Sequence, residues 1–307
     1  MWLLLTGLTG FVLLPLLLWA LLPWYSAITL YIILLSWKPS RSEMIRKSFL
    51  GPKLRDTVQY KTICVPESQE LDETEQYIFA MHPHGLFAFS EMLTFVFHNP
   101  YTALKSHAVT AIPLVATELL WLPLLGHLAA ALGCESVDRE NFELLLGQKR
   151  SVAITPGGVR EAKHASDCSE QHVTLRKCDG FLKIAYTKSI AAVPMLVTGE
   201  HTCYRFLPSV SAVQNLSIKL FGWPFPVFAL GRWFSFWPRR SGPLTISFGS
   251  PVRREEAMSE EEFISCYYSE LNRIAVKTNV ELLYVDVEGQ VISKAGATIK
   301  ERSESTD

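Results

Sequence analysis

The first 37 residues of the chain contain no Asp, Glu, Lys or Arg, and this run constrains the fold more than any other feature. It consists almost entirely of Leu, Trp, Ile, Phe and Ala, with Pro15 and Pro23 interrupting it. About 20 apolar residues suffice to cross a bilayer, and so long an uncharged run is rarely covered by protein on all sides. We therefore expect residues 1–37 to form a membrane-embedded helical segment. A single tilted span and a re-entrant hairpin that returns near Pro23 both fit the sequence.

Basic residues follow the apolar run and predict the side of the membrane on which the rest of the chain lies. These cations are Lys38, Arg41, Arg46, Lys47, Lys53 and Arg55. An excess of Lys and Arg beside a span favours the cytoplasmic side, and such cations also attract anionic lipid headgroups. We expect membrane lipid to be a partner and the remaining domain to face the cytosol.

The overall charge and the cysteines limit the classes of function. Lys plus Arg number 29 and Asp plus Glu number 30, so the formal net charge is -1. Without a basic excess, the composition does not indicate a nucleic-acid partner. The six cysteines show neither a Cys-x-x-Cys pair nor the spacing of zinc ligands, which predicts free thiols in a reducing compartment and no metal site.

Beyond residue 75, stretches typical of strands and of helices alternate. The strand-like stretches occupy residues 77–81, 151–155, 191–197 and 244–248. Helix-like stretches include residues 181–188 and 260–277, and the second begins with a capping-box pattern, Ser259 followed by Glu262. This alternation predicts an α/β fold with a mixed, largely parallel sheet flanked by helices.

The expected domain organisation follows from these patterns. Residues 1–37 are the membrane anchor, and residues 38–75 are a linker that is first basic and then polar. Residues 76–292 are expected to form the main α/β domain, which contains the motifs described below. The polar tail, residues 293–307, has too few apolar residues to pack and is expected to be disordered.

The tetrapeptide His82-Pro83-His84-Gly85 directly follows a predicted strand. Ligands of parallel α/β sheets gather beyond the carboxyl ends of the strands, and histidine changes charge near neutral pH. The pattern therefore predicts that one imidazole acts as a general base in a site at this edge. A turn that carries two surface histidines is the alternative interpretation.

A second turn, Pro156-Gly157-Gly158, follows another predicted strand, and Glu161 comes about one helical turn later. Two adjacent glycines permit positive φ and bring bare backbone close to a ligand. Their N–H groups would then polarise a carbonyl oxygen. A carboxylate that accepts a hydrogen bond from the His84 imidazole would fix its tautomer, although a solvated Glu161 on a loop fits the sequence equally well.

Together these segments resemble the diacylglycerol acyltransferase type 2 family, which includes monoacylglycerol and wax-alcohol acyltransferases. The resemblance rests on three blocks: residues 77–85, the Gly157-Gly158 turn with Glu161, and residues 173–183. It continues through Val193-Pro194 and Gly199-Glu200 to Gly231-Arg232 and so covers residues 77–250. The order of several motifs makes the resemblance fairly specific, whereas each motif alone would be weak.

The resemblance implies a glycerophosphate-acyltransferase-like fold and acyl transfer from acyl-CoA to a neutral lipid alcohol, with diacylglycerol as the first expectation and triacylglycerol as its product. Monoacylglycerol, wax-alcohol and lysophospholipid acyltransferases are alternatives, as is a non-catalytic lipid-droplet protein on the same fold. Acyl-CoA is a co-substrate, and no cofactor is implied. The implied location is the endoplasmic reticulum membrane, with the lipid droplet as a second site. The sequence leaves open whether the chain forms a homodimer.

The resemblance also implies roles for individual residues. His84 matches the catalytic base, Glu161 its acidic partner and His82 the other motif histidine. The candidates for substrate binding are Gly85, Gly157, Gly158, Arg160, Arg176, Lys183 and Glu200. Candidates to meet the phosphates of CoA are Arg176, Lys177, Lys183 and Arg232.

This chain departs from glycerophosphate acyltransferases, in which an acid follows the histidine five residues on. Phe89 stands five residues after His84, so the acid must come from elsewhere, and Glu161 is the candidate. The phosphate-binding Glu-Gly-Thr-Arg stretch of those enzymes is also missing, which favours a neutral acceptor, although Arg160 could still meet an anion. A histidine-rich metal site that combines His82 and His84 with His107 or His164 is the remaining alternative.

Overall fold

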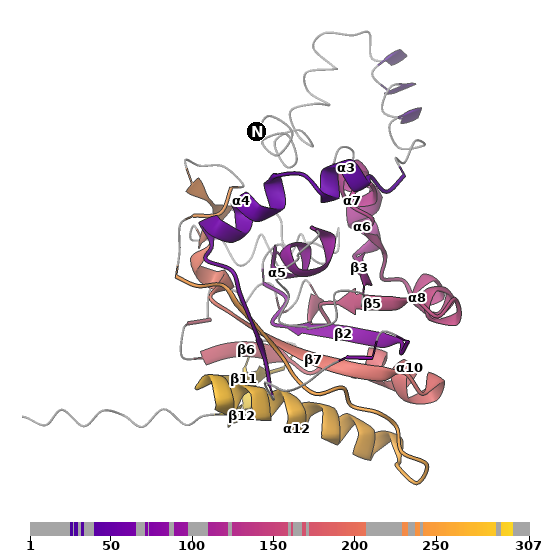
Figure 1. Cartoon of the computed structure of the whole chain (residues 1–307), viewed down its shortest axis with the longest axis vertical. Coiled ribbons are helices and arrows are strands. Elements are labelled where there is room, and N and C mark those ends of the chain that lie inside the picture. Colours follow the sequence, from indigo (N-terminus) through magenta and orange to yellow (C-terminus); the bar gives the residue numbers. More distant parts are fainter. Residues whose placement is uncertain are drawn as a thin grey trace, which may run out of the picture.

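A seven-stranded sheet forms the centre of the protein (Figure 1). A computed structural model of the chain describes residues 25–26, 28–29, 32–33, 40–65, 71–72, 74–85, 89–97, 110–121, 125–158, 161, 168–169, 172–206, 229–232, 237–239, 242–286 and 290–296. In spatial order, the strands of the sheet are β1 (Lys61–Cys64), β10 (Thr245–Phe248), β7 (Ala191–Thr198), β2 (Tyr77–His82), β5 (Ser151–Ile154), β3 (Ala111–Val115) and β4 (Glu135–Ser136).

Neighbouring strands of this sheet run parallel, except for β10 and β7, which are antiparallel. In the antiparallel pair, Thr245 at the start of β10 lies opposite Thr198 at the end of β7. The predicted mixed and largely parallel sheet is therefore confirmed. The central strand β2 is buried along its whole length, as expected for a parallel strand that is covered on both faces.

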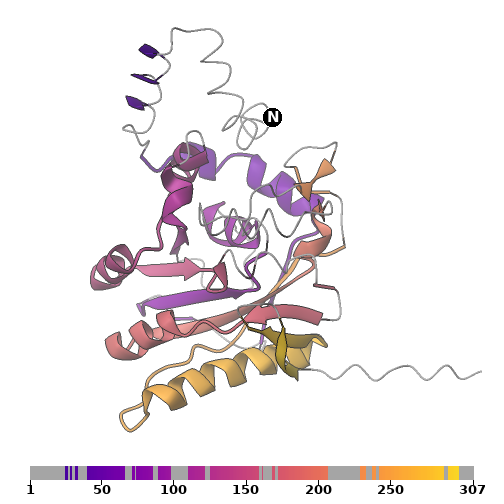
Figure 2. The same cartoon turned by 180° about the vertical axis from the view of Figure 1, so that it is seen from behind.

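Helices cover both faces of the sheet, and alternate residues of β2 supply the two cores (Figures 1 and 2). Ile78 and Ala80 pack in one cluster with side chains of α8 (Arg139–Gly147), α10 (Gly180–Lys188) and α12 (Glu260–Thr278). Tyr77, Phe79 and Met81 pack in the other, because successive side chains of a strand point to opposite faces. The helices of this second face are α4 (Leu50–Thr57) and α5 (Phe89–Glu91), and α5 continues directly into the π-helix η1 (Met92–Val96).

The remaining elements are short. The helices are α3 (Glu43–Arg46), α6 (Thr117–Trp121), α7 (Leu125–Ala131) and the 3-10 helix η3 (Glu200–Thr202). A three-stranded sheet joins β12 (Val291–Gly296), β11 (Glu281–Val285) and β6 (His172–Arg176), and β8 (Arg205–Phe206) pairs with β9 (Ala229–Leu230). The predicted capping box at the start of α12 is confirmed, since Ser259 and Glu262 exchange hydrogen bonds.

The structure differs from the predicted boundaries in three places. Residues 38–75 are more than a linker, because they contain α3, α4 and the edge strand β1. Residues 172–176, which are not among the predicted strand-like stretches, form β6, which pairs in parallel with β11. Strand β12 continues past Ser293, where we expect the disordered tail to begin, because its residues pair with β11.

Two further expectations concern the cysteines and the anchor. All six cysteines are free thiols, as predicted. No helix in the part of the chain that the structure describes combines the length and the apolar character required to cross a bilayer. Most of the expected anchor, residues 1–37, lies outside the described residues.

Candidate active site

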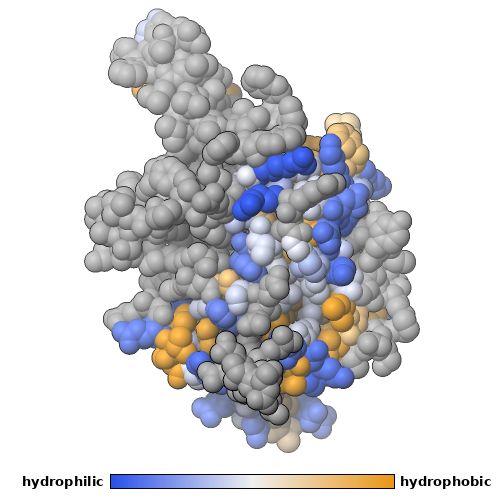
Figure 3. Space-filling model, turned by 90° about the vertical axis from the view of Figure 1, so that its left-hand side faces the viewer, coloured by the Kyte–Doolittle hydropathy of each residue, from blue (hydrophilic) through white to orange (hydrophobic). Residues whose placement is uncertain are grey.

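The predicted site residues gather where three parallel strands end. His84 follows β2, Gly157 follows β5 and Glu200 follows β7. These carboxyl ends lie at the left-hand edge of the sheet in Figure 1, and Figure 3 faces the same edge. At the centre of the surface in Figure 3, residues of intermediate hydropathy lie between more hydrophilic patches.

The imidazole of His84 is oriented by its neighbour in the chain. Its Nδ1 lies 2.8 Å from the carbonyl oxygen of Gly85. A carbonyl can only accept, so Nδ1 carries the hydrogen and Nε2 keeps its lone pair. Burial lowers the pKa of His84 from its usual 6.5, and the hydrogen bond to Gly85 opposes this shift. A neutral imidazole with a lone pair on Nε2 is the form that a general base requires.

Glu161 meets His84 at the backbone rather than at the ring. Its Oε1 accepts a hydrogen bond of 2.5 Å from the amide of His84, and its Oε2 accepts one of 2.7 Å from the amide of Arg176. Each oxygen accepts from a backbone amide and Nδ1 of the ring is bound to Gly85, so the expectation that Glu161 fixes the tautomer of the imidazole is corrected. The carbonyl of Gly85 has that role, whereas Glu161 ties the turn after β2 to the end of β6.

Burial dominates the ionisation of Glu161, which is only 1% exposed. The loss of solvent raises its pKa to about 7, and the two backbone hydrogen bonds and the charge of Arg176 partly oppose the rise. Both oxygens accept hydrogen bonds, an arrangement that suits the carboxylate form.

His82 lies inside the protein and has a structural environment. Its Nε2 is 3.0 Å from the hydroxyl of Tyr267 on α12, and its ring packs edge-on against the tyrosine. Burial lowers the pKa of His82 to about 3, so the ring stays neutral at physiological pH. These contacts fit a residue that joins β2 to α12 better than the catalytic role that the motif suggests.

Both glycine turns bring backbone close to a carboxylate. A Cβ on Gly157 would overlap the side chain of Glu161, and a Cβ on Gly85 would overlap the carboxylate of Glu200. Gly85 also has a φ of +61°, which favours glycine. The amide of Gly158 donates to Thr155 across the turn at 3.3 Å, so the turn itself uses one of the N–H groups that we expected to polarise a substrate carbonyl.

The carboxylate of Glu200 binds backbone amides of the protein. Its two carboxylate oxygens accept 3.3 Å hydrogen bonds from the amides of Phe89 and Ser90 at the start of α5. The side chain is buried, and burial raises its pKa to about 7. The candidate substrate-binding residue Glu200 therefore also braces the helix that follows the His-Pro-His-Gly turn.

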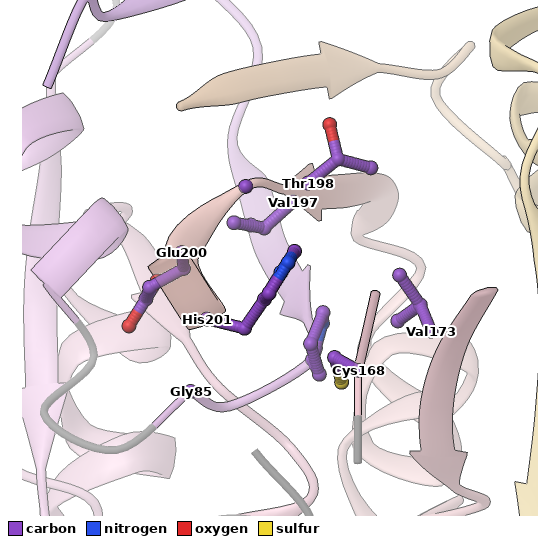
Figure 4. A pocket seen from close by; sticks show the side chains of 9 residues that line it. Gly85, Cys168, Val173, Val197, Thr198, Glu200 and His201 are labelled. Carbon is purple, nitrogen blue, oxygen red and sulfur yellow. The ribbon is translucent and has the colours of Figure 1, made fainter. Parts of the chain in front are cut away.

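A small pocket opens beside this turn (Figure 4). The residues that line it include Pro83, Gly85, Cys168, Val173, Thr198 and His201. Figure 4 shows the side chains of His201 and Cys168 extending toward the same space. Sequence reasoning missed His201, although its position directly after Gly199-Glu200 at the end of β7 was a usable signal.

The cations expected near CoA phosphates have different surroundings. Arg176 lies next to Glu161, whose pKa its charge lowers. Lys183 is 60% exposed and lies 3.7 Å from Glu260. The ammonium of Lys177 lies 5.0 Å from the ring centre of Tyr268 and 5.1 Å from that of Tyr284, so cation–π contacts hold it.

Some of the expected site residues are outside the described part of the chain. They are Arg160, His107 and His164. Among the residues that are described, His, Cys, Asp and Glu side chains do not gather in groups of three that could hold a metal ion.

The fold and the site define a class of protein, an α/β enzyme with a neutral histidine at the carboxyl edge of its sheet. A family model described as "Diacylglycerol acyltransferase" matches residues 11–270. The chain belongs to this family and is an acyltransferase, which confirms the resemblance seen in the sequence.

Curated relatives agree with this assignment. The chain is 25% identical over 253 residues to a protein of Schizosaccharomyces pombe named "Diacylglycerol O-acyltransferase 1", which covers 76% of this chain and 72% of that one. The protein of the same name from Saccharomyces cerevisiae is 29% identical, and the alignment covers 70% of this chain and 55% of that one. The human "2-acylglycerol O-acyltransferase 1" is 26% identical, and the alignment covers 61% of this chain and 57% of that one. A crystal structure of the 1-acyl-sn-glycerophosphate acyltransferase of Thermotoga maritima aligns with a TM-score of 0.42 and 13% identity, covering 74% and 78%.

Proposed function

We propose that the protein transfers an acyl group from acyl-CoA to a neutral lipid alcohol, with diacylglycerol as the acceptor and triacylglycerol as the product. The observation that carries this proposal is the His84 imidazole, whose Nδ1 is bound to Gly85 and whose Nε2 is left to act as a base. Relatives named for diacylglycerol support this acceptor. A relative named for 2-acylglycerol makes monoacylglycerol the second candidate.

The reaction follows from the free Nε2 of His84. This nitrogen takes the proton of the acceptor hydroxyl while the oxygen attacks the thioester carbonyl carbon of acyl-CoA. The new C–O bond forms, the C–S bond then breaks, and the imidazolium returns the proton to the departing thiolate of CoA. General-base catalysis of this kind contributes about 10²–10⁴ in rate. Glu161 acts in this scheme by holding the backbone of His84 in place.

Arg176 and Lys183 are our candidates for binding the phosphates of CoA, together with Arg160. Arg176 ends β6, the strand that Glu161 ties to the catalytic turn, and Lys183 lies seven residues later in α10. The exposed ammonium of Lys183 would exchange its partner Glu260 for a phosphate at small cost, because surface ion pairs contribute little.

We further propose that the enzyme works at the endoplasmic reticulum membrane with its catalytic domain facing the cytosol, and also at lipid droplets. Large, mostly exposed apolar side chains in residues 25–33, on α3, between α3 and α4 and on α6 support a lipid-facing surface. They are Tyr25, Ile28, Ile32, Ile33, Met44, Phe49 and Trp121. The exposed Lys47 and Lys53, near Phe49 in the chain, would meet anionic headgroups.

An acceptor panel tests the proposed function. The full chain in lipid vesicles would receive labelled oleoyl-CoA with diacylglycerol, monoacylglycerol, a long-chain alcohol, a lysophospholipid or glycerol 3-phosphate. We expect labelled triacylglycerol as the main product, and we expect the His84→Ala variant to form none above background. Product from phosphorylated acceptors alone would reject the neutral-lipid assignment.

A further inference from the structure

The helix that follows the His-Pro-His-Gly turn is held at both ends by charged side chains from elsewhere in the chain. It comprises α5 and η1, together residues 89–96. A helix this short is unstable by itself, and its first N–H and last C=O groups have no partners within it. The side chains that bind these N–H and C=O groups therefore fix the position of the helix.

At the start of the helix, Glu200 accepts hydrogen bonds from the amides of Phe89 and Ser90. At its other end, two arginines donate to carbonyl oxygens. Arg46 reaches Val96 through Nε at 2.8 Å and Phe95 through Nη2 at 3.2 Å. Arg55 reaches the carbonyl of Leu93 through Nη1 at 3.1 Å.

The signs of these charges match the dipole of the helix, which favours an anion at the amino end and cations at the carboxyl end. Arg46 and Arg55 are each only 8% exposed. Buried guanidinium groups are costly unless their donors are satisfied. A lysine at either position would offer a point charge instead of the planar fork of donors.

The same helix is linked to the base through Glu200. The carboxylate of Glu200 abuts Gly85 so closely that a Cβ on Gly85 would overlap it. The carbonyl of Gly85 in turn orients Nδ1 of His84. A displacement of the helix would therefore move Glu200 or Gly85, and with them the imidazole.

We propose that Arg46 and Arg55 are positioning residues for His84, which they hold in place through the helix of residues 89–96 and Glu200. This inference rests on the proposed function only in taking His84 as the base. It assigns a role inside the protein to Arg46 and Arg55, which the sequence places among the basic residues expected to face the membrane. Their exposed neighbours Lys47 and Lys53 lack this role.

Glutamine variants test the proposal against matched controls. Arg46→Gln and Arg55→Gln keep a polar side chain but lose the charge, and Lys61→Gln and Lys277→Gln remove charge from exposed positions on β1 and α12. We expect the arginine variants to lower kcat by about 10- to 100-fold, since small misplacements of a catalytic group have effects of this size. KM for acyl-CoA should stay near the wild-type value, and the lysine variants should keep wild-type kcat.

Two further readouts separate positioning from simple loss of folded protein. The acid limb of kcat/KM should move toward the usual pKa of histidine in the arginine variants, because a looser site admits water to His84. Arg55→Lys should recover more activity than Arg46→Lys, because Arg55 donates one hydrogen bond to the helix whereas Arg46 donates two in a fork. Wild-type kcat in both glutamine variants, or a lower kcat with an unchanged pH profile, would overturn the proposal.

Hydrogen exchange makes the test independent of the proposed activity. In the full-length protein, amides of residues 89–97 should exchange faster in Arg46→Gln and Arg55→Gln, and at the wild-type rate in Lys61→Gln. If no acceptor is acylated by the wild type while exchange changes as expected, the proposed function fails but the anchoring of the helix stands. If exchange in this segment is unchanged, the proposed link from the arginines to His84 is wrong whatever the activity.

Discussion

Replacing Glu161 with glutamine tests how this carboxylate supports the base. The substitution keeps the length of the side chain but turns one oxygen into an amide group that only donates. In the wild type, the amides of His84 and Arg176 each donate to one carboxylate oxygen. In Glu161→Gln, one of these two amides would therefore face a second donor and lose its partner.

Two opposing energies set the effect on stability. Loss of a hydrogen bond to a charged group costs about 1.5–3 kcal/mol. Burial of the carboxylate raises its pKa from 4.5 to about 7, and this rise disfavours the charged form by about 3 kcal/mol once the pH exceeds 7. Glutamine avoids this second cost. We therefore expect the free energies of unfolding of variant and wild type to be similar near neutral pH.

Glu161→Gln and the wild type should differ little in their free energy of unfolding near neutral pH. They should differ more in how this free energy changes with pH. Because the pKa of Glu161 is raised in the folded state, its contribution to stability is largest below pH 4.5 and is lost as the pH rises to about 7. The glutamine variant has no proton to lose there. Urea unfolding at several pH values within this window should give a smaller decline for the variant.

The effect of Glu161→Gln on catalysis shows whether Glu161 acts on the backbone of His84 or on its ring. Misplacing the backbone of His84 should lower kcat about 10- to 100-fold. The acid limb of kcat/KM should keep its midpoint, because Gly85 and not Glu161 contacts the imidazole. The assay is acyl transfer by vesicle-bound protein across a pH series, with Glu143→Gln, a partly exposed glutamate on α8 that pairs with Arg139, as the control. A midpoint that falls by a pH unit or more in Glu161→Gln alone would refute this reasoning, since it would place the carboxylate at the ring.

Four further predictions follow from the same site. Replacing His84 by alanine should lower kcat by about 10²–10⁴ without shifting the thermal unfolding midpoint, and near-normal turnover would remove His84 from the mechanism. The midpoint of the acid limb of wild-type kcat/KM should lie below pH 6.5, because the pKa of His84 is lowered; a midpoint above 6.5 would contradict the burial of the ring. Gly85→Ala should cost about 1–3 kcal/mol in urea unfolding, from its positive φ and its overlap with a carboxylate, whereas Gly180→Ala, with open space around it, should not destabilise. Tyr267→Phe should cost about 1 kcal/mol by removing the hydrogen bond to His82 and should leave kcat unchanged; a large loss of kcat would give His82 a part in the chemistry.

The sequence was sufficient to predict the central strands and the meeting of the site residues. Strands β2 and β7 are continuous apolar runs, which is the pattern of strands that are buried on both faces. A turn with special residues follows each of them, and parallel strands bring their carboxyl ends to one edge. His84, Glu161 and Glu200 accordingly belong to one connected set of contacts.

Contacts between residues that are far apart in the chain could not be predicted from local sequence patterns. Arg46 and Arg55 bond to carbonyls that lie 38 to 50 residues away, and arginine is usually an exposed residue. Strand β6 has inward-facing Val173 and Leu175 but is short and surrounded by polar residues, and its partner β11 comes much later in the chain. Glu161 was correctly paired with His84 but at the wrong atom, because a sequence does not reveal whether a backbone amide needs an acceptor.

The antiparallel course of β10 has a consequence for how such enzymes can diversify. Thr198 ends β7 and Thr245 begins β10 directly opposite it, so the chain between them both leaves and re-enters the sheet at the catalytic edge. Insertions, deletions and substitutions in the segment between Thr198 and Thr245 can leave the pairing of the two strands unchanged. Evolution can thereby alter what approaches the histidine without disturbing the framework beneath it.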